Sequence, residues 1–117
     1  MTRREPMPHF LSKLLAPRKT FGRDMTAEER DVMRAHADYW LPHVGAATVI
    51  AMGPVADPAG VWGVAIVNAP SLAWLEAAQA SDPAILSGRG FVYENFSMPA
   101  IQVAPITPLA PVSSVSP

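Results

Sequence analysis

The chain contains no cysteine among its 117 residues. This absence excludes a disulfide framework, a zinc site built on thiolates and a cysteine nucleophile. A chain without cysteine is compatible with a reducing compartment, and we expect a cytoplasmic protein.

Long apolar runs are missing as well. No stretch reaches the roughly 18 consecutive apolar residues of a membrane-spanning helix. The first residues include two arginines, but no apolar run of signal-peptide length follows them. We therefore expect neither a secretion signal nor a membrane partner.

Charged residues are few and nearly balanced. They make up 16% of the chain, and the formal net charge is −1. Such a balance excludes a disordered polyelectrolyte and argues against a nucleic-acid binder that is attracted by bulk charge. Residues 1–34 hold eight of the nine basic residues, but five acids are interleaved with them. A solvated strand and helix explains this pattern better than an anion-binding patch.

Half of the residues are apolar, which predicts one folded domain at this length. Proline is abundant, and it is concentrated near the C-terminal end, at Pro99, Pro105, Pro108, Pro111 and Pro117. Proline at this density disfavours helices and central strands. We predict a domain over residues 1–99 and a flexible, proline-rich tail over residues 100–117. The Pro-x-x-Pro spacings in that tail leave open a polyproline II ligand for a partner groove.

The apolar pattern of the domain alternates between strand and helix. We expect strands at residues 10–15, 46–52, 61–68 and 91–96, helices at residues 26–41 and 72–80, and a short helical turn at residues 81–86. Thr26 and Glu29 have the spacing of a capping box at the start of the first helix, and Pro42 is expected to end that helix. The order β-α-β-β-α-β is typical of a ferredoxin-like α+β domain.

The third predicted strand is apolar on both faces. Val61, Ala65 and Val67 point to one side, and Trp62, Val64 and Ile66 point to the other. Two helices can cover only one face of the sheet, so the other face would be a large exposed apolar patch. We expect a homodimer that joins the two chains through these sheet faces.

His36 is the candidate catalytic residue. It lies on one stripe of the first helix with Val32, Tyr39, Trp40 and His43, so its ring should point toward the sheet. From the residues alone, a histidine that is satisfied by a backbone carbonyl remains the more common explanation. His36 and His43 are seven residues apart, too far along a helix to share one metal ion, so we expect no protein-only metal site.

Two aspartates precede prolines in predicted turns. Asp57 begins the reversal Asp57-Pro58-Ala59-Gly60, and Asp82 precedes Pro83 at the short helical turn. Bracing a turn or capping a helix explains both without any chemistry. The chain has neither a Gly-rich phosphate loop nor a Gly-x-Ser-x-Gly elbow, so nucleotide and serine-hydrolase chemistry find no support.

Several short segments, in this order and at this spacing, resemble the YciI-related (YCII) domain. The resemblance spans about residues 8–98, and it is carried by the segments His9-Phe10, Met25-Thr26-Ala27-Glu28-Glu29, His36-Ala37-Asp38-Tyr39-Trp40, Gly53-Pro54-Val55-Ala56-Asp57-Pro58-Ala59-Gly60 and Asp82-Pro83. It implies a dimeric α+β barrel. It also implies a His–Asp pair at a pocket, for which His36 and Asp57 are the matching positions, and Asp82-Pro83 matches the family's Asp-Pro near the second helix. The proline-rich segment after Pro99 departs from the compact pattern of the family.

Proteins of this kind include a dehydrochlorinase of chlorinated hydroxyquinols, and the wider fold group includes muconolactone isomerase and small monooxygenases. The resemblance thus implies a lyase or isomerase that needs no cofactor. In this reading His36 is the general acid and base, and Asp57 fixes its tautomer. Tyr39, Trp40, Trp62 and Asp82 would bind a small, aromatic or lactone-like substrate. Two alternatives stay open: a ligand-binding or assembly domain without turnover, and a heme-dependent or oxygen-dependent enzyme of the same fold group.

Overall fold

The computed structural model of the chain describes residues 8–104. Four antiparallel strands form one sheet: β1 (His9–Leu15), β2 (Val49–Val55), β3 (Trp62–Asn68) and β4 (Val92–Met98). Their order across the sheet is β2-β3-β1-β4. The prediction of an α+β domain is confirmed, and residues 105–117 of the tail predicted over residues 100–117 lie outside the described residues.

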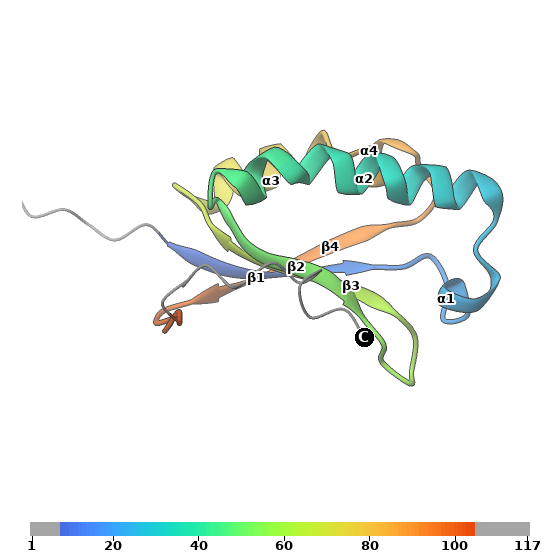
Figure 1. Cartoon of the computed structure of the whole chain (residues 1–117), viewed down its shortest axis with the longest axis horizontal. Coiled ribbons are helices and arrows are strands. Elements are labelled where there is room, and N and C mark those ends of the chain that lie inside the picture. Colours follow the sequence, from blue (N-terminus) through green and yellow to red (C-terminus); the bar gives the residue numbers. More distant parts are fainter. Residues whose placement is uncertain (1–7, 105–117) are drawn as a thin grey trace, which may run out of the picture.

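Four helices accompany the sheet. They are α1 (Phe21–Asp24), α2 (Ala27–Gly45), α3 (Leu72–Ala80) and α4 (Pro83–Leu86). Figure 1 shows that α2, α3 and α4 all lie on one side of the sheet, while no helix of the described residues covers the opposite face. No helix within residues 8–104 is both long enough and apolar enough to cross a membrane.

Two predicted boundaries near the middle of the chain are wrong, and both involve proline. Helix α2 continues through Pro42 to Gly45. Pro42 has no amide N–H to donate within the helix. Its carbonyl still accepts the N–H of Ala46 at 3.0 Å, and this bond holds the last turn. Strand β2 therefore begins later than expected and includes Pro54. A proline fits there because β2 is an edge strand with one unpaired side.

The strand register sorts the sheet residues into two faces. The helix-facing side carries the row Met52, Ala65, Ser12 and Asn95 and the row Pro54, Gly63, Leu14 and Tyr93. The uncovered side carries the row Ala51, Ile66, Leu11 and Phe96 and the row Val55, Trp62, Leu15 and Val92. Both faces are thus largely apolar, as the pattern of the third strand predicts.

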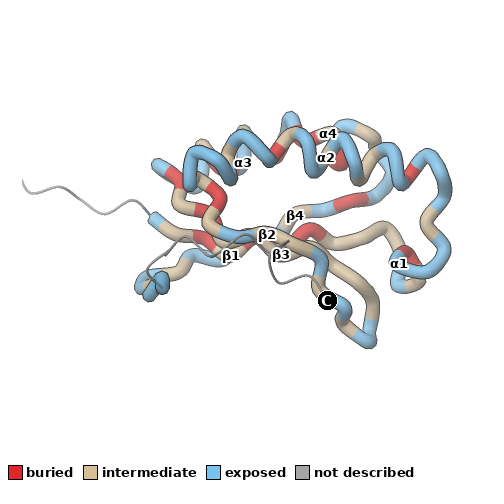
Figure 2. The backbone as a smooth tube through the Cα atoms, in the orientation of Figure 1, coloured by how far each residue is buried: buried red, intermediate tan, exposed pale blue. Residues whose placement is uncertain are grey.

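The apolar core under the helices is split into two clusters. One is built on Phe10, Trp40, Val49, Val67, Ala69 and Leu75, and the other on Leu14, Phe21, Ala84 and Phe91. Figure 2 shows buried segments on the helices and on the strands that face them. The inward positions between the two clusters carry Ser12, Gly63 and Ala65, whose side chains are too small to fill the space.

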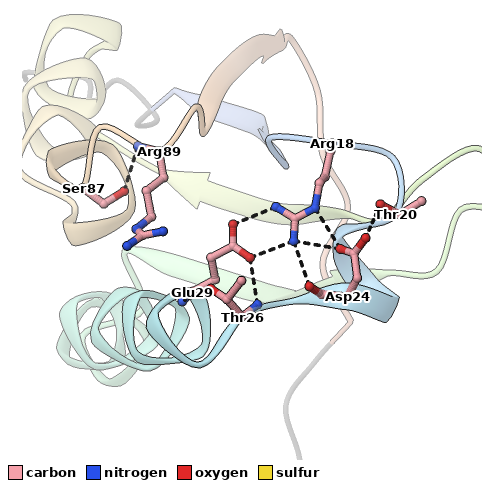
Figure 3. Close-up of polar contacts among 7 residues, drawn as sticks. All are labelled: Arg18, Thr20, Asp24, Thr26, Glu29, Ser87 and Arg89. Carbon is pink, nitrogen blue, oxygen red and sulfur yellow. Dashed lines mark hydrogen bonds and ion pairs between the residues drawn. The ribbon is translucent and has the colours of Figure 1, made fainter.

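The start of α2 is fixed by a capping box and an arginine. Thr26 accepts the N–H of Glu29 at 3.1 Å, and the Glu29 carboxylate accepts the N–H of Thr26 at 2.9 Å, so the predicted capping box is confirmed. Arg18 donates two hydrogen bonds of 2.8 Å to the same carboxylate and a third of 2.8 Å to Asp24, as Figure 3 shows. This network ties α1 to the first turn of α2.

The carboxylate of Glu29 gives this network a defined pH dependence. The hydrogen bonds from Arg18 and from the Thr26 backbone lower the pKa of Glu29 from 4.5 to about 2. A carboxylate whose pKa is lower in the folded chain stabilises the fold above its unfolded pKa, and that contribution is lost as the pH falls through the folded pKa. The window for Glu29 therefore lies between pH 4.5 and pH 2.

The variant Glu29→Gln tests this window. Glutamine keeps the capping side chain but cannot titrate. We expect the difference in free energy of unfolding between wild type and Glu29→Gln to be constant above pH 5 and to shrink toward pH 2, measured by urea denaturation. Glu28→Gln, at the exposed neighbouring position of the same turn, is the matched control and should show no such trend. A difference that stays constant down to pH 2 would contradict the assignment.

Candidate active site in the space between helix α2 and the sheet

A cavity of about 760 Å³ lies between α2 and the helix-facing side of the sheet. Its floor includes the small residues Ser12, Gly63 and Ala65 on the two central strands, and its roof includes His36, Trp40 and other residues of α2. The exposed side chains Leu41 and Val44 belong to the lining, so the cavity opens to solvent along α2. Volumes of this size are typical of small-molecule sites.

His36 places one ring nitrogen against a carboxylate and leaves the other free. Its side chain is 15% exposed, and Nδ1 lies 2.7 Å from Oδ2 of Asp82. A carboxylate only accepts hydrogen bonds, so Nδ1 carries the proton of this bond. Nε2 has no hydrogen-bond partner within residues 8–104 and is not among the buried atoms, and His36 lines the cavity. The free nitrogen is therefore accessible to a molecule in the cavity.

Asp82 is completely buried and fully hydrogen-bonded. Its Oδ2 accepts from Nδ1 of His36, from Nε1 of Trp40 at 2.8 Å and from the hydroxyl of Tyr93. Its Oδ1 accepts the N–H of Ala84 at 2.8 Å, because Asp82 is the N-cap of α4 and Pro83 is the first residue of that helix. Groups from α2, β4 and α4 thus converge on one carboxylate.

These donors keep Asp82 ionised. Burial alone would raise its pKa, but the hydrogen bonds from His36, Tyr93, Trp40 and the Ala84 amide together outweigh burial and lower the pKa of Asp82 below its ordinary value. Burial and the bond to Asp82 have the opposite effect on the pKa of the Tyr93 hydroxyl, which they raise strongly. Tyr93 therefore stays protonated and acts as a donor.

The predicted pairing of His36 with Asp57 is wrong. Asp57 accepts the N–H of Ala59 at 2.8 Å and Nε1 of Trp62 at 3.0 Å, and its backbone carbonyl accepts the N–H of Gly60 at 2.9 Å. These bonds brace the turn between β2 and β3, as the sequence alone favoured. The carboxylate that meets His36 comes instead from Asp82, because α4 packs against α2.

The predicted aromatic wall is present only in part. Trp40 lines the cavity and is 4% exposed. Trp62 belongs to a strand that borders the cavity, but its side chain lies on the uncovered side of the sheet, where the indole donates to Asp57 and lies beneath the ammonium of Lys13, whose Nζ is 4.5 Å from the ring centroid. Tyr39 is not part of the lining, because its hydroxyl donates to the carbonyl of Ala78 at 2.7 Å and holds α3.

Tyr93 is the functional residue that sequence reasoning missed. It lies on the fourth strand, two residues after the buried Phe91, so strand alternation places both on the helix-facing side. A tyrosine that points into a core usually bonds its hydroxyl to a partner. That signal could have marked Tyr93 as a neighbour of a buried acceptor, although not of Asp82 in particular.

A second polar group closes the cavity on the side of α3. The side-chain amides of Gln79 and Asn95 bond each other reciprocally at 2.9 and 2.8 Å. Ser12 donates to Asn95 at 2.6 Å and accepts from Gln79 at 3.2 Å. This cluster joins α3 to β1 and β4, and each of its side chains is hydrogen-bonded to the other two.

The arrangement suits proton transfer more than metal chemistry. No group of three or more His, Asp or Glu side chains lies close enough to hold a metal ion in the part of the chain that the structure describes. A neutral imidazole that is held in one tautomer by a buried carboxylate presents an unshared electron pair on Nε2. Such a group takes a proton from a substrate and returns it, provided the substrate reaches hydrogen-bond distance.

Comparisons with protein-family models, with curated proteins and with solved structures gave no match to this chain.

Filling the cavity should change the free energy of unfolding. Replacing Ala65 by leucine puts a larger apolar side chain on the cavity floor, so we expect Ala65→Leu to raise the free energy of unfolding by about 1 kcal/mol. Ala77→Leu, on the exposed side of α3, is the matched control and should change it by less than about 0.5 kcal/mol. Urea denaturation measures both. A destabilisation of Ala65→Leu by about 1 kcal/mol or more would mean that no space is free above Ala65.

Proposed function

We propose that this protein is an enzyme of the lyase or isomerase type that needs no cofactor and moves a proton on a small molecule bound in the cavity. His36 is the catalytic residue and takes the proton on Nε2. Asp82 is the positioning residue that fixes the ring and stabilises its protonated form. The observation that carries the proposal is the His36–Asp82 bond of 2.7 Å, with the free nitrogen beside a cavity of about 760 Å³.

The surroundings of the pair support this chemistry. Asp82 has no exposed surface and already holds four hydrogen bonds, so it is an acceptor with a fixed charge rather than a second base. When His36 gains a proton, the positive ring lies against this carboxylate in a site sheltered from water, where the attraction is stronger than in bulk solvent. Abstraction of a weakly acidic proton becomes easier for that reason.

The resemblance to the YciI-related domain supports the same proposal, with Asp82 in the role expected for Asp57. A ferredoxin-like arrangement is likewise supported by the strand order β2-β3-β1-β4 and by helices on one face only. A ligand-binding domain without turnover is the alternative, and the mostly apolar cavity would serve it equally well. The enzyme and the ligand-binding domain differ in whether the bound molecule loses a proton.

The test uses 5-nitrobenzisoxazole, an uncharged aromatic probe with one acidic C–H. A base removes the proton from C3 while the N–O bond breaks, and the product is a coloured cyanonitrophenolate. We expect saturable turnover by the wild-type chain, with the proton passing to Nε2 of His36. A positioned base contributes about 10²- to 10⁴-fold, so His36→Ala should lower kcat/KM by at least about 100-fold.

His9→Ala is the matched control, because this imidazole is not among the residues that line the cavity. Its kcat/KM should equal that of the wild type. Circular dichroism and urea denaturation of each variant show whether the fold is kept. Turnover that survives in a folded His36→Ala, or rates that never saturate, would contradict the proposed role of His36.

We also propose that two copies of the chain associate through the uncovered faces of their sheets, as in a dimeric α+β barrel. That face carries two apolar rows, in which Phe96 and Val92 are 50% and 53% exposed. Between these rows Lys13 and Glu94 lie opposite each other across β1 and β4. A two-fold axis through this centre would bring apolar rows together and place charges of opposite sign in reach. A stable contact needs about 800 Å² from each chain.

Analytical ultracentrifugation of the whole chain tests this association. We expect a mass of two chains at micromolar concentration, and a mass of one chain for Ile66→Glu, which places a charge in the middle of the face. Leu86→Glu is the matched control, since Leu86 is 69% exposed on the helix side, and it should leave the dimer intact. A wild type that sediments near 12.5 kDa would contradict the proposal.

A further inference from the structure

The cavity offers one unsatisfied hydrogen-bonding atom to a ligand. Five side chains with polar groups line the cavity, namely Ser12, His36, Trp40, Gln79 and Tyr93. Ser12 and Gln79 are hydrogen-bonded within their cluster with Asn95, and Trp40 and Tyr93 donate to Asp82. Nε2 of His36 is the group that remains free in the described chain.

The lining also lacks charge. No Asp, Glu, Lys or Arg belongs to it, and the ionised group directly behind it is the Asp82 carboxylate. A ligand carboxylate or phosphate would lose its hydration without meeting a lysine or arginine, and it would be repelled by Asp82. A cationic ligand would find no carboxylate in the lining to pair with. The cavity thus disfavours ions of either sign.

A hydroxyl group matches the free nitrogen in both protonation states of the ring. It donates to Nε2 when the imidazole is neutral, and it accepts from Nε2–H when the ring is protonated. The remaining wall is built from aliphatic, aromatic and methionine side chains, which favour a rigid apolar body. The volume of about 760 Å³ leaves room for two or three fused rings.

We infer that the cavity binds an uncharged, mostly apolar ring compound whose single hydroxyl or enol group lies against Nε2 of His36. This inference rests on the proposed function and names its substrate class. The hydroxyl would direct the molecule so that its acidic proton, on that oxygen or on the adjoining carbon, faces the base.

Three probes of one shape test this inference on the full chain at pH 7: naphthalene, 1-naphthol and 1-naphthoate. Titrations are followed by NMR on the indole N–H of Trp40, which lines the cavity. One hydrogen bond to the ring should make 1-naphthol bind about tenfold more tightly than naphthalene. The charge of 1-naphthoate should make it bind at least tenfold more weakly than 1-naphthol.

Two variants assign these differences to the site. In His36→Leu, which keeps a side chain of similar size, the affinity for 1-naphthol should fall to that for naphthalene. In Ala65→Leu, which fills the floor of the cavity, both should bind at least tenfold more weakly than in the wild type. If His36→Leu does not fold, the order of the three probes in the wild type and the loss in Ala65→Leu decide the question.

The inference is overturned if 1-naphthoate binds as tightly as 1-naphthol, if 1-naphthol has no advantage over naphthalene, or if none of the three shifts the Trp40 signal. These binding results are independent of whether the proposed reaction is observed. A preference for 1-naphthol without turnover of 5-nitrobenzisoxazole would keep the ligand class and remove the chemistry. Turnover with a preference for 1-naphthoate would keep the chemistry and remove the ligand class.

Discussion

One buried carboxylate organises this protein. Asp82 has no contact with solvent, and it accepts hydrogen bonds from α2, from β4 and from the first turn of α4. A buried charge is tolerated only when hydrogen-bond donors surround it. Removal of any one donor leaves the buried carboxylate with too few hydrogen bonds, which destabilises the fold. The position of α2 above the sheet and the orientation of His36 both follow from this cluster.

The cavity is the second constraint, and it opposes the first. Aromatic and branched side chains fill the two ends of the space beneath α2, while Ser12, Gly63 and Ala65 leave its middle open. An unfilled space in a core of this size costs stability. The polar bonds at Asp82 and the ion pairs of Arg18 with Asp24 and Glu29 hold the helix in place where apolar contact is missing. Such a balance is common where a fold keeps room for a ligand.

The sequence predicts the elements well because local rules determine them. Short apolar runs bounded by turn residues indicate all four strands, the Thr26 capping box marks the start of α2, and the helical stripe turns His36 inward. The partner of His36 could not be predicted in the same way. Asp57 and Asp82 both precede a proline in a turn, and the choice between them depends on α4 packing against α2, which is a long-range contact. The cavity could not be predicted from the sequence either, because the small residues of its floor are seen to be neighbours only when the strand register is known.

The tautomer of His36 is the most direct test of its hydrogen bond to Asp82. Long-range ¹H–¹⁵N correlation spectra of the imidazole distinguish the nitrogen that carries hydrogen from the one that does not. In the neutral form of the ring, we expect hydrogen on Nδ1, held by Asp82, and an unprotonated Nε2. A neutral His36 with its hydrogen on Nε2 would contradict the account, because Nδ1 could then no longer donate to the carboxylate and no free electron pair would face the cavity.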